Sequence, residues 1–127
     1  GMAETTTLLN SATRERIREL VATSIVYLIH TSRGKYISFT SRRIRKLIQG
    51  EVDAPIMAVS QAVSRMLDRL YNYGVIDAIE TKDYRRKFVK RWYFIFNDNE
   101  LWKLAKTNPG LATKFLIDVL GDGHASD

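Results

Sequence analysis

The spacing of apolar residues predicts a long helix near the start of the chain. Between about residues 12 and 31, apolar positions recur every three or four residues, which is the period of a helix with one buried face. Ser11 or Thr13 would cap the start of this helix, and Gly34 lies just beyond its end. The expected buried positions are Ile17, Leu20, Val21, Ile25, Leu28 and Ile29. Residues 1–10 are polar and lack this period, so we expect a disordered arm there.

A short strand and a second helix follow. Residues 35–39 are rich in β-branched and aromatic side chains, which is typical of a strand. Thr40 or Ser41 would cap a helix over residues 41–49, and Gly50 would end it. The inward positions of this second helix would be Ile44, Leu47 and Ile48.

A third helix is predicted from about residue 56 to Tyr73. Asp53 or Ala54 would cap it, Pro55 would lie in its first turn, and Gly74 would end it. The inward face would comprise Ile56, Val59, Val63, Met66, Leu67 and Leu70. The outward face would comprise Met57, Ser60, Gln61, Ser64, Arg65, Asp68 and Arg69.

A hairpin is predicted next. Its strands would cover residues 75–80 and 88–96, and a polar tip over residues 81–87 would join them. The second strand alternates two sets of side chains, Trp92, Phe94 and Phe96 on one side, and Tyr93 and Ile95 on the other. This alternation indicates buried core on one face of the strand and partial cover on the other; base stacking by the aromatic residues is the alternative.

Two helices are expected after the hairpin. They would cover residues 98–106 and 110–120, separated by the Asn108-Pro109-Gly110 turn, and Gly121 would stop the second. Residues 122–127 would form a loose tail.

Composition then excludes several classes of site. The chain has 127 residues, 45% of them hydrophobic, which fits one globular domain. It has no cysteine and two distant histidines, so we expect no disulfide, thiol nucleophile or metal site. No nucleophile–base pair or glycine-rich phosphate loop is recognisable, so we expect neither a cofactor nor enzymatic activity.

The sequence also indicates where in the cell the protein is expected. No apolar stretch approaches the ~18 residues that a membrane helix needs. We also find no basic-then-apolar signal pattern, so we expect a cytoplasmic protein without a membrane partner.

The positive charge is concentrated in the middle of the chain. Residues 33–96 hold 14 basic and six acidic residues, a net charge of +8, whereas the whole chain has a net charge of +6. One cluster comprises Arg33, Lys35, Arg42, Arg43, Arg45 and Lys46. The other comprises Lys82, Arg85, Arg86, Lys87, Lys90 and Arg91. Because the clusters flank the third helix, they favour a polyanionic partner over an ordinary solvated surface.

The order of elements over residues 12–96 resembles the winged helix-turn-helix family. The local signature is a Val63-Ser64-Arg65 run, then Leu67 and Leu70, then Gly74-Val75-Ile76 leading into the hairpin, or wing. The resemblance implies an α+β fold, mainly α with a small antiparallel β-wing, over residues 11–97. Additional C-terminal helices would cover residues 98–121. The connection between the second and third helices is longer than a tight helix-turn-helix turn.

The resemblance also implies a double-stranded DNA-binding transcriptional regulator of the small prokaryotic type, associated with the nucleoid. Helix 56–73 would read bases in the major groove, while helix 41–49 and the wing over residues 81–91 would hold phosphates. The candidate base-reading residues are Met57, Ser60, Gln61, Ser64 and Arg65. The candidate phosphate or wing contacts are Lys35, Ser41, Arg42, Arg43, Lys46, Arg69, Lys82, Arg85, Arg86 and Lys87.

Partners other than DNA stay open at this point. The apolar stripes of helices 12–31 and 98–120 predict either a homodimer through these helices or packing of the C-terminal helices on their own core. A protein–protein interaction module of a transcription or replication assembly is the alternative function. Single-strand or RNA binding would require Tyr84, Phe88 or Tyr93 to be exposed in a basic groove.

Overall fold

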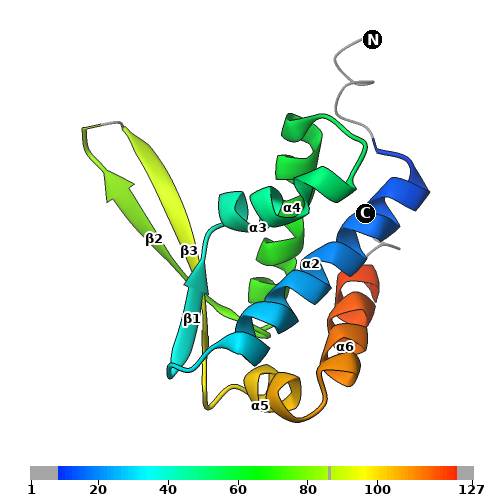
Figure 1. Ribbon diagram of the computed structural model, residues 1–127. Coiled ribbons are helices and arrows are strands. Elements are labelled where there is room, and N and C mark those ends of the chain that lie inside the picture. The colour runs from blue at the N-terminus through cyan, green and yellow to red at the C-terminus, as the bar shows by residue number, and fades with distance from the viewer. Residues whose placement is uncertain (1–8, 86, 123–127) are drawn as a thin grey trace.

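The computed structural model describes residues 9–85 and 87–122, and these form an α+β fold that is mainly helical (Figure 1). The elements in chain order are α2 (Ser11–Thr31), β1 (Tyr36–Phe39), α3 (Ser41–Ile48), the 3₁₀ helix η1 (Gln49–Glu51), α4 (Ile56–Asn72), β2 (Asp77–Asp83), β3 (Phe88–Phe96), α5 (Glu100–Thr107) and α6 (Pro109–Asp122). The predicted types and order of the α-helices and strands are confirmed, whereas η1, which contains Gly50, was not predicted. Residues 1–8 of the predicted arm, Arg86 and residues 123–127 of the predicted tail lie outside the described residues.

Side chains and glycine fix the helix ends. Asn10, which we had assigned to the arm, caps α2 by accepting a 2.8 Å hydrogen bond from the Thr13 backbone N–H, so the Ser11 and Thr13 caps were wrong. Thr40 caps α3 as predicted. Pro55 is the N-cap of α4 and its carbonyl oxygen accepts from the Val59 N–H, so the Asp53 and Ala54 caps were wrong and Pro55 precedes the first turn. Gly121 lies inside α6 rather than beyond it.

Gly74 ends α4 in a Schellman turn. Its φ of +75° is the left-handed conformation that only glycine adopts at low cost. The Gly74 N–H donates to the Tyr71 carbonyl and the Val75 N–H donates to the Leu70 carbonyl, each at 2.9 Å. Because Val75 completes this turn, β2 begins at Asp77, two residues later than the strand predicted from residue 75.

The sheet is antiparallel and has the order β1-β3-β2. β1 pairs with the second half of β3, where Phe39 lies opposite Tyr93. β2 pairs with residues 88–94 of β3, from Asp77 opposite Phe94 to Asp83 opposite Phe88. The end of the hairpin therefore has two strands, and at ~3.3 Å per residue it extends about 16 Å beyond Tyr93.

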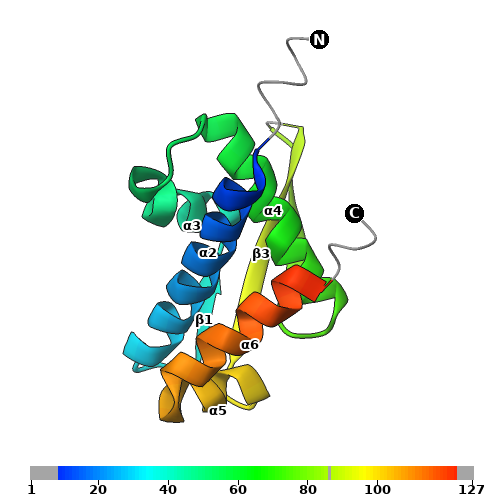
Figure 2. The same ribbon diagram turned by 90° about the vertical axis from the view of Figure 1, so that its right-hand side faces the viewer.

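The helices cover one face of the sheet (Figures 1 and 2). α2 lies centrally among them, and seven of its residues are buried. The inner face of the sheet contributes Phe39, Tyr93 and Ile95 to the same core. The rings of Phe39 and Tyr93 stack with their centroids 5.9 Å apart.

α6 packs along α2 within the same chain (Figure 2). Ala112, Leu116 and Leu120 on α6 are buried, as is the inward stripe of α2. Within the described residues, the apolar face that had suggested a homodimer is thus largely covered intramolecularly.

Two inward assignments were wrong. Leu47 on α3 and Ile56 on α4 are both exposed, although their helical spacing placed them on the buried stripes. Each lies near the end of its helix, where the neighbouring element no longer covers it.

Two glycines give a direct test of the α4 terminus. A Cβ at Gly74 or at Gly50 would meet nothing within 4 Å, so the two positions differ mainly in backbone conformation. Gly74→Ala should lower the free energy of unfolding by about 1–2 kcal/mol, because alanine is strained at positive φ. Gly50→Ala should leave it unchanged or raise it by up to about 1 kcal/mol. Urea denaturation measures both, and equal effects would contradict this account.

Candidate nucleic-acid interface

The outward face of α4 carries the five candidate base-reading residues. Met57, Gln61 and Arg65 are exposed and lie one helical turn apart along a single line. Ser60 and Ser64 are half-buried beside them. The opposite side of α4 is fixed in the core by Val59, Val63, Leu67 and Leu70.

Basic side chains from two other elements lie at the same end of the molecule. α3, the start of α4 and the hairpin tip all lie in the upper half of both views, and in Figure 1 the hairpin projects to the left of the helices (Figures 1 and 2). Arg42, Arg43 and Lys46 on α3 are exposed, and Ser41 is half-buried at its start. The hairpin adds Lys82, Arg85 and Lys87, which are also exposed. The fourth hairpin candidate, Arg86, lies outside the described residues.

Lys87 has an unusual backbone at the hairpin tip. Its φ of +54° lies in the left-handed region, where a residue with a side chain is strained. Glycine or asparagine is the usual choice at such turn positions. The chain therefore retains an exposed cation at a position where backbone energetics favour glycine.

Two predicted phosphate contacts lie elsewhere. Lys35 directly precedes β1, whose first residue Tyr36 pairs with Phe96 at the far end of β3 from the tip. Arg69 lies in the last turn of α4, and its guanidinium donates a 2.8 Å hydrogen bond to the Leu120 carbonyl near the end of α6. This contact places a positive charge at the negative end of a helix dipole. Neither side chain joins the basic group at the tip.

A carboxylate ties α4 to the hairpin. Asp68 Oδ1 accepts a 2.7 Å hydrogen bond from Arg91 Nη1 and another of 2.7 Å from the Tyr93 hydroxyl. Arg91 also pairs with Glu80 on β2 and lies over the ring of Tyr71 on α4. Two residues of α4, one of β2 and two of β3 thus form one network that connects α4 to the sheet.

This network shifts the pKa values of Arg91 and Tyr93. The hydrogen bonds to Glu80 and Asp68 raise the pKa of Arg91 above its already high usual value, so Arg91 stays charged. Burial, followed by the hydrogen bond to Asp68, raises the pKa of Tyr93. Because Arg91 is shared between two carboxylates, it adds little net positive charge to the hairpin surface.

Sequence reasoning missed this role of Arg91, although a signal was present. Arg91, Tyr93 and Ile95 are alternate residues of β3 and therefore share its inner face. Tyr93 is only 2% exposed, which removes one of the three aromatic residues considered for base stacking. Tyr84 and Phe88 are exposed near the tip.

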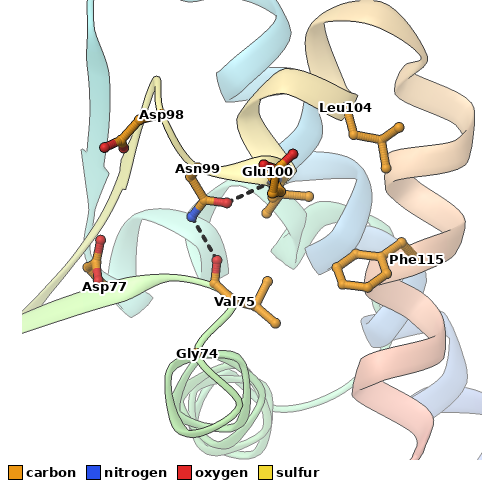
Figure 3. Close-up of a pocket in the computed structure, with 9 residues that line it drawn as sticks. Gly74, Val75, Asp77, Asp98, Asn99, Glu100, Leu104 and Phe115 are labelled. Atoms are coloured by element: carbon orange, nitrogen blue, oxygen red, sulfur yellow. Dashed lines mark hydrogen bonds between the residues drawn. The ribbon is translucent and has the colours of Figure 1, made fainter.

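A cavity of about 510 Å³ lies beyond the C-terminal end of α4, and Figure 3 shows the residues that line it. It opens between the Gly74–Val75 turn, the start of α5 and Phe115 on α6. Asn99 joins two of these segments, because its amide donates to the Val75 carbonyl and its oxygen accepts from the Leu101 N–H. Carboxylates of Asp77, Asp98 and Glu100 line the cavity, which makes this end unfavourable for a polyanion.

Comparisons with known proteins add no identity. No protein-family model matches the chain, and neither the curated proteins nor the solved structures include a significant match. Among the described residues, every helix is too short or too polar to cross a membrane.

The Asp68 network can be tested by a double-mutant cycle. Asp68→Ala should lower the free energy of unfolding by about 1–3 kcal/mol, because the buried Tyr93 hydroxyl and Arg91 lose an acceptor. In a Tyr93→Phe background the same substitution should cost less, since one of the two donors is gone.

Asp118→Ala on the exposed side of α6 is the control and should change stability by less than about 0.5 kcal/mol. Additive costs of Asp68→Ala and Tyr93→Phe would mean that the two side chains are not energetically coupled.

Proposed function

We propose that the protein binds double-stranded DNA as a winged-helix transcriptional regulator. One observation carries the proposal: exposed cations on α3 and on the hairpin tip lie at the same end as the polar outward face of α4. The element order and the β1-β3-β2 sheet agree with the arrangement that the winged-helix resemblance implies.

In this proposal α4 enters the major groove. Gln61 suits bidentate hydrogen bonding to adenine and Arg65 suits guanine, while Ser60 and Ser64 permit close approach. Met57 would add an apolar contact at the first turn. These side chains point outward because Val59, Val63 and Leu67 fix the opposite face of α4 in the core.

Phosphates on either side of the groove would be held by α3 and the hairpin. Arg42 and Arg43 lie in the first turn of α3, where the helix dipole also favours an anion. The two-stranded end of the hairpin extends beyond the rest of the sheet, so Lys82, Arg85 and Lys87 could follow the DNA backbone. The strained backbone of Lys87 supports this use, because residues in strained backbone conformations cluster at functional sites.

A homodimer would place two α4 helices on successive turns of DNA. Because α2 and α6 cover each other within one chain, pairing through them would rest on side chains that stay exposed, such as Tyr27, Leu111 and Phe115. Association with the nucleoid in the cytoplasm would follow from DNA binding.

A protein-interaction module is the second candidate, and one observation favours it. Leu47, Ile56 and Met57 are exposed on α3 and the first turn of α4, and Met57 is 68% exposed. Apolar side chains in such positions are typical of contacts with another protein. This function would make duplex binding weak and insensitive to the hairpin cations.

Lys87→Gly separates binding from folding. The substitution should leave stability unchanged or raise it by up to about 1 kcal/mol, because glycine relieves the positive φ. It should nevertheless weaken duplex binding at every DNA sequence and reduce the slope of log affinity against log salt by about 1. Fluorescence anisotropy across a salt series measures both the affinity and the slope.

Lys114→Ala is the matched control, because Lys114 is an exposed lysine on α6. It should leave affinity and slope unchanged. Wild-type protein whose duplex affinity does not fall with salt would contradict the proposed function and favour the protein-interaction module.

A further inference from the structure

The second face of the sheet is open and aromatic. Residues that alternate with the buried Tyr93 and Ile95 point away from the helices, and so do their direct partners on β1 and β2. We call this set the outer face: Tyr36, Ser38, Asp77, Ile79, Thr81, Phe88, Lys90, Trp92, Phe94 and Phe96. All described helices lie on the other side of the sheet (Figures 1 and 2).

Much of the outer face is solvent-exposed apolar surface. Tyr36 and Ile79 are each 52% exposed, and Phe88 and Phe96 are also exposed. Tyr36, Phe94 and Phe96 form a continuous aromatic cluster with ring centroids 5.7–6.3 Å apart. A contiguous exposed apolar patch of this kind commonly marks a binding surface.

Two oppositely charged residues of the outer face lie on either side of its centre. Ile79 and Trp92 are direct partners across β2 and β3. The next pair on this face toward the hairpin tip is Thr81 and Lys90. The next pair in the other direction is Asp77 and Phe94. A cation and an anion thus lie at equal distances on opposite sides of one apolar pair.

We propose that the outer face binds a second copy of this chain through a two-fold axis that crosses the strands at the Ile79–Trp92 pair. A two-fold interface is self-complementary, so each residue meets the residue at the opposite position. The axis would bring Lys90 of each copy near Asp77 of the other, with Ile79 and Trp92 buried between two aligned sheets.

The same charges make a single-stranded nucleic acid the less suitable occupant. Among the described side chains of the outer face, Lys90 and Asp77 cancel, so a polyanion gains little attraction there. The Lys90 ammonium also lies 5.0 Å from the centre of the Trp92 ring, where a base would have to stack. A second copy would form ion pairs with both Asp77 and Lys90, whereas a nucleic acid would be attracted only to Lys90.

Analytical ultracentrifugation of the full chain without DNA tests the proposal. A three-stranded surface is a small interface, so we expect a monomer–dimer equilibrium with a dissociation constant in the micromolar range. The mass should rise with concentration from 14.6 kDa toward twice that value. Ile79→Arg should raise the dissociation constant at least about 30-fold, because the variant buries a charge at the centre of the interface.

Tyr73→Arg is the matched control, since Tyr73 is an exposed aromatic residue at the end of α4 and lies outside the outer face. It should leave the dissociation constant unchanged, and circular dichroism should show that both variants are folded. Wild-type protein that stays monomeric throughout the concentration series, or equal effects of Tyr73→Arg and Ile79→Arg, would overturn the proposal.

A charge swap tests the two-fold geometry itself. Asp77→Lys and Lys90→Glu should each weaken the dimer, because each sets like charges against one another. The double variant should restore the dissociation constant to within a few-fold of wild type. Failure of the double variant to recover would overturn the Lys90–Asp77 arrangement.

A single-stranded thymidine oligonucleotide tests the competing occupant. We expect it to leave the tryptophan fluorescence unchanged. Saturable quenching that disappears in Trp92→Phe would assign the outer face to nucleic acid and overturn the proposal. None of these measurements uses duplex DNA, so their outcome is independent of the proposed function.

Discussion

The hydrogen bonds from Arg91 and Tyr93 to Asp68 determine how the hairpin lies against the helices. Beyond Tyr93 the hairpin has lost β1, and it reaches the helices through side chains on its inner face. Arg91 and Tyr93 both donate to one carboxylate oxygen on α4, and Arg91 carries the connection on to Glu80 of β2. A shift of the hairpin therefore requires the loss of a charge-assisted hydrogen bond, which costs more than a neutral one. Cations at the hairpin tip are in this way held at a defined position relative to the outward face of α4.

The two ends of the molecule have opposite character. Exposed arginines and lysines of α3 and the hairpin tip gather at one end, whereas Asp77, Asp98 and Glu100 line the cavity at the other. A polyanion approaching the protein would be attracted to the first end and repelled from the second. This asymmetry is stronger than the net charge of +6 suggests, because the excess lies within residues 33–96.

Local signals in the sequence were sufficient for the elements and for the face of α4. The period of apolar residues identified α2 and α4, and Gly74 identified the turn that a positive φ requires. Contacts between distant segments were not accessible in this way. Arg69 meets the end of α6, and no local pattern distinguishes it from Arg65, which stays exposed. Strand alternation places Arg91 on the inner face of β3, but it does not show that Arg91 meets Asp68. Leu47 and Ile56 have buried-stripe spacing but lie beyond the reach of their neighbours.

The most direct test of the central claim is an amide chemical-shift map of the protein titrated with duplex DNA. The account predicts that the perturbed amides lie between Ile56 and Arg65 on α4, in the first turn of α3 and at the hairpin tip. Arg65 and Lys87 should be among them, and Lys114 on α6 should be unaffected. Shifts confined to the outer face of the sheet, or to α5 and α6, would contradict the proposal that α4 and the hairpin bind double-stranded DNA.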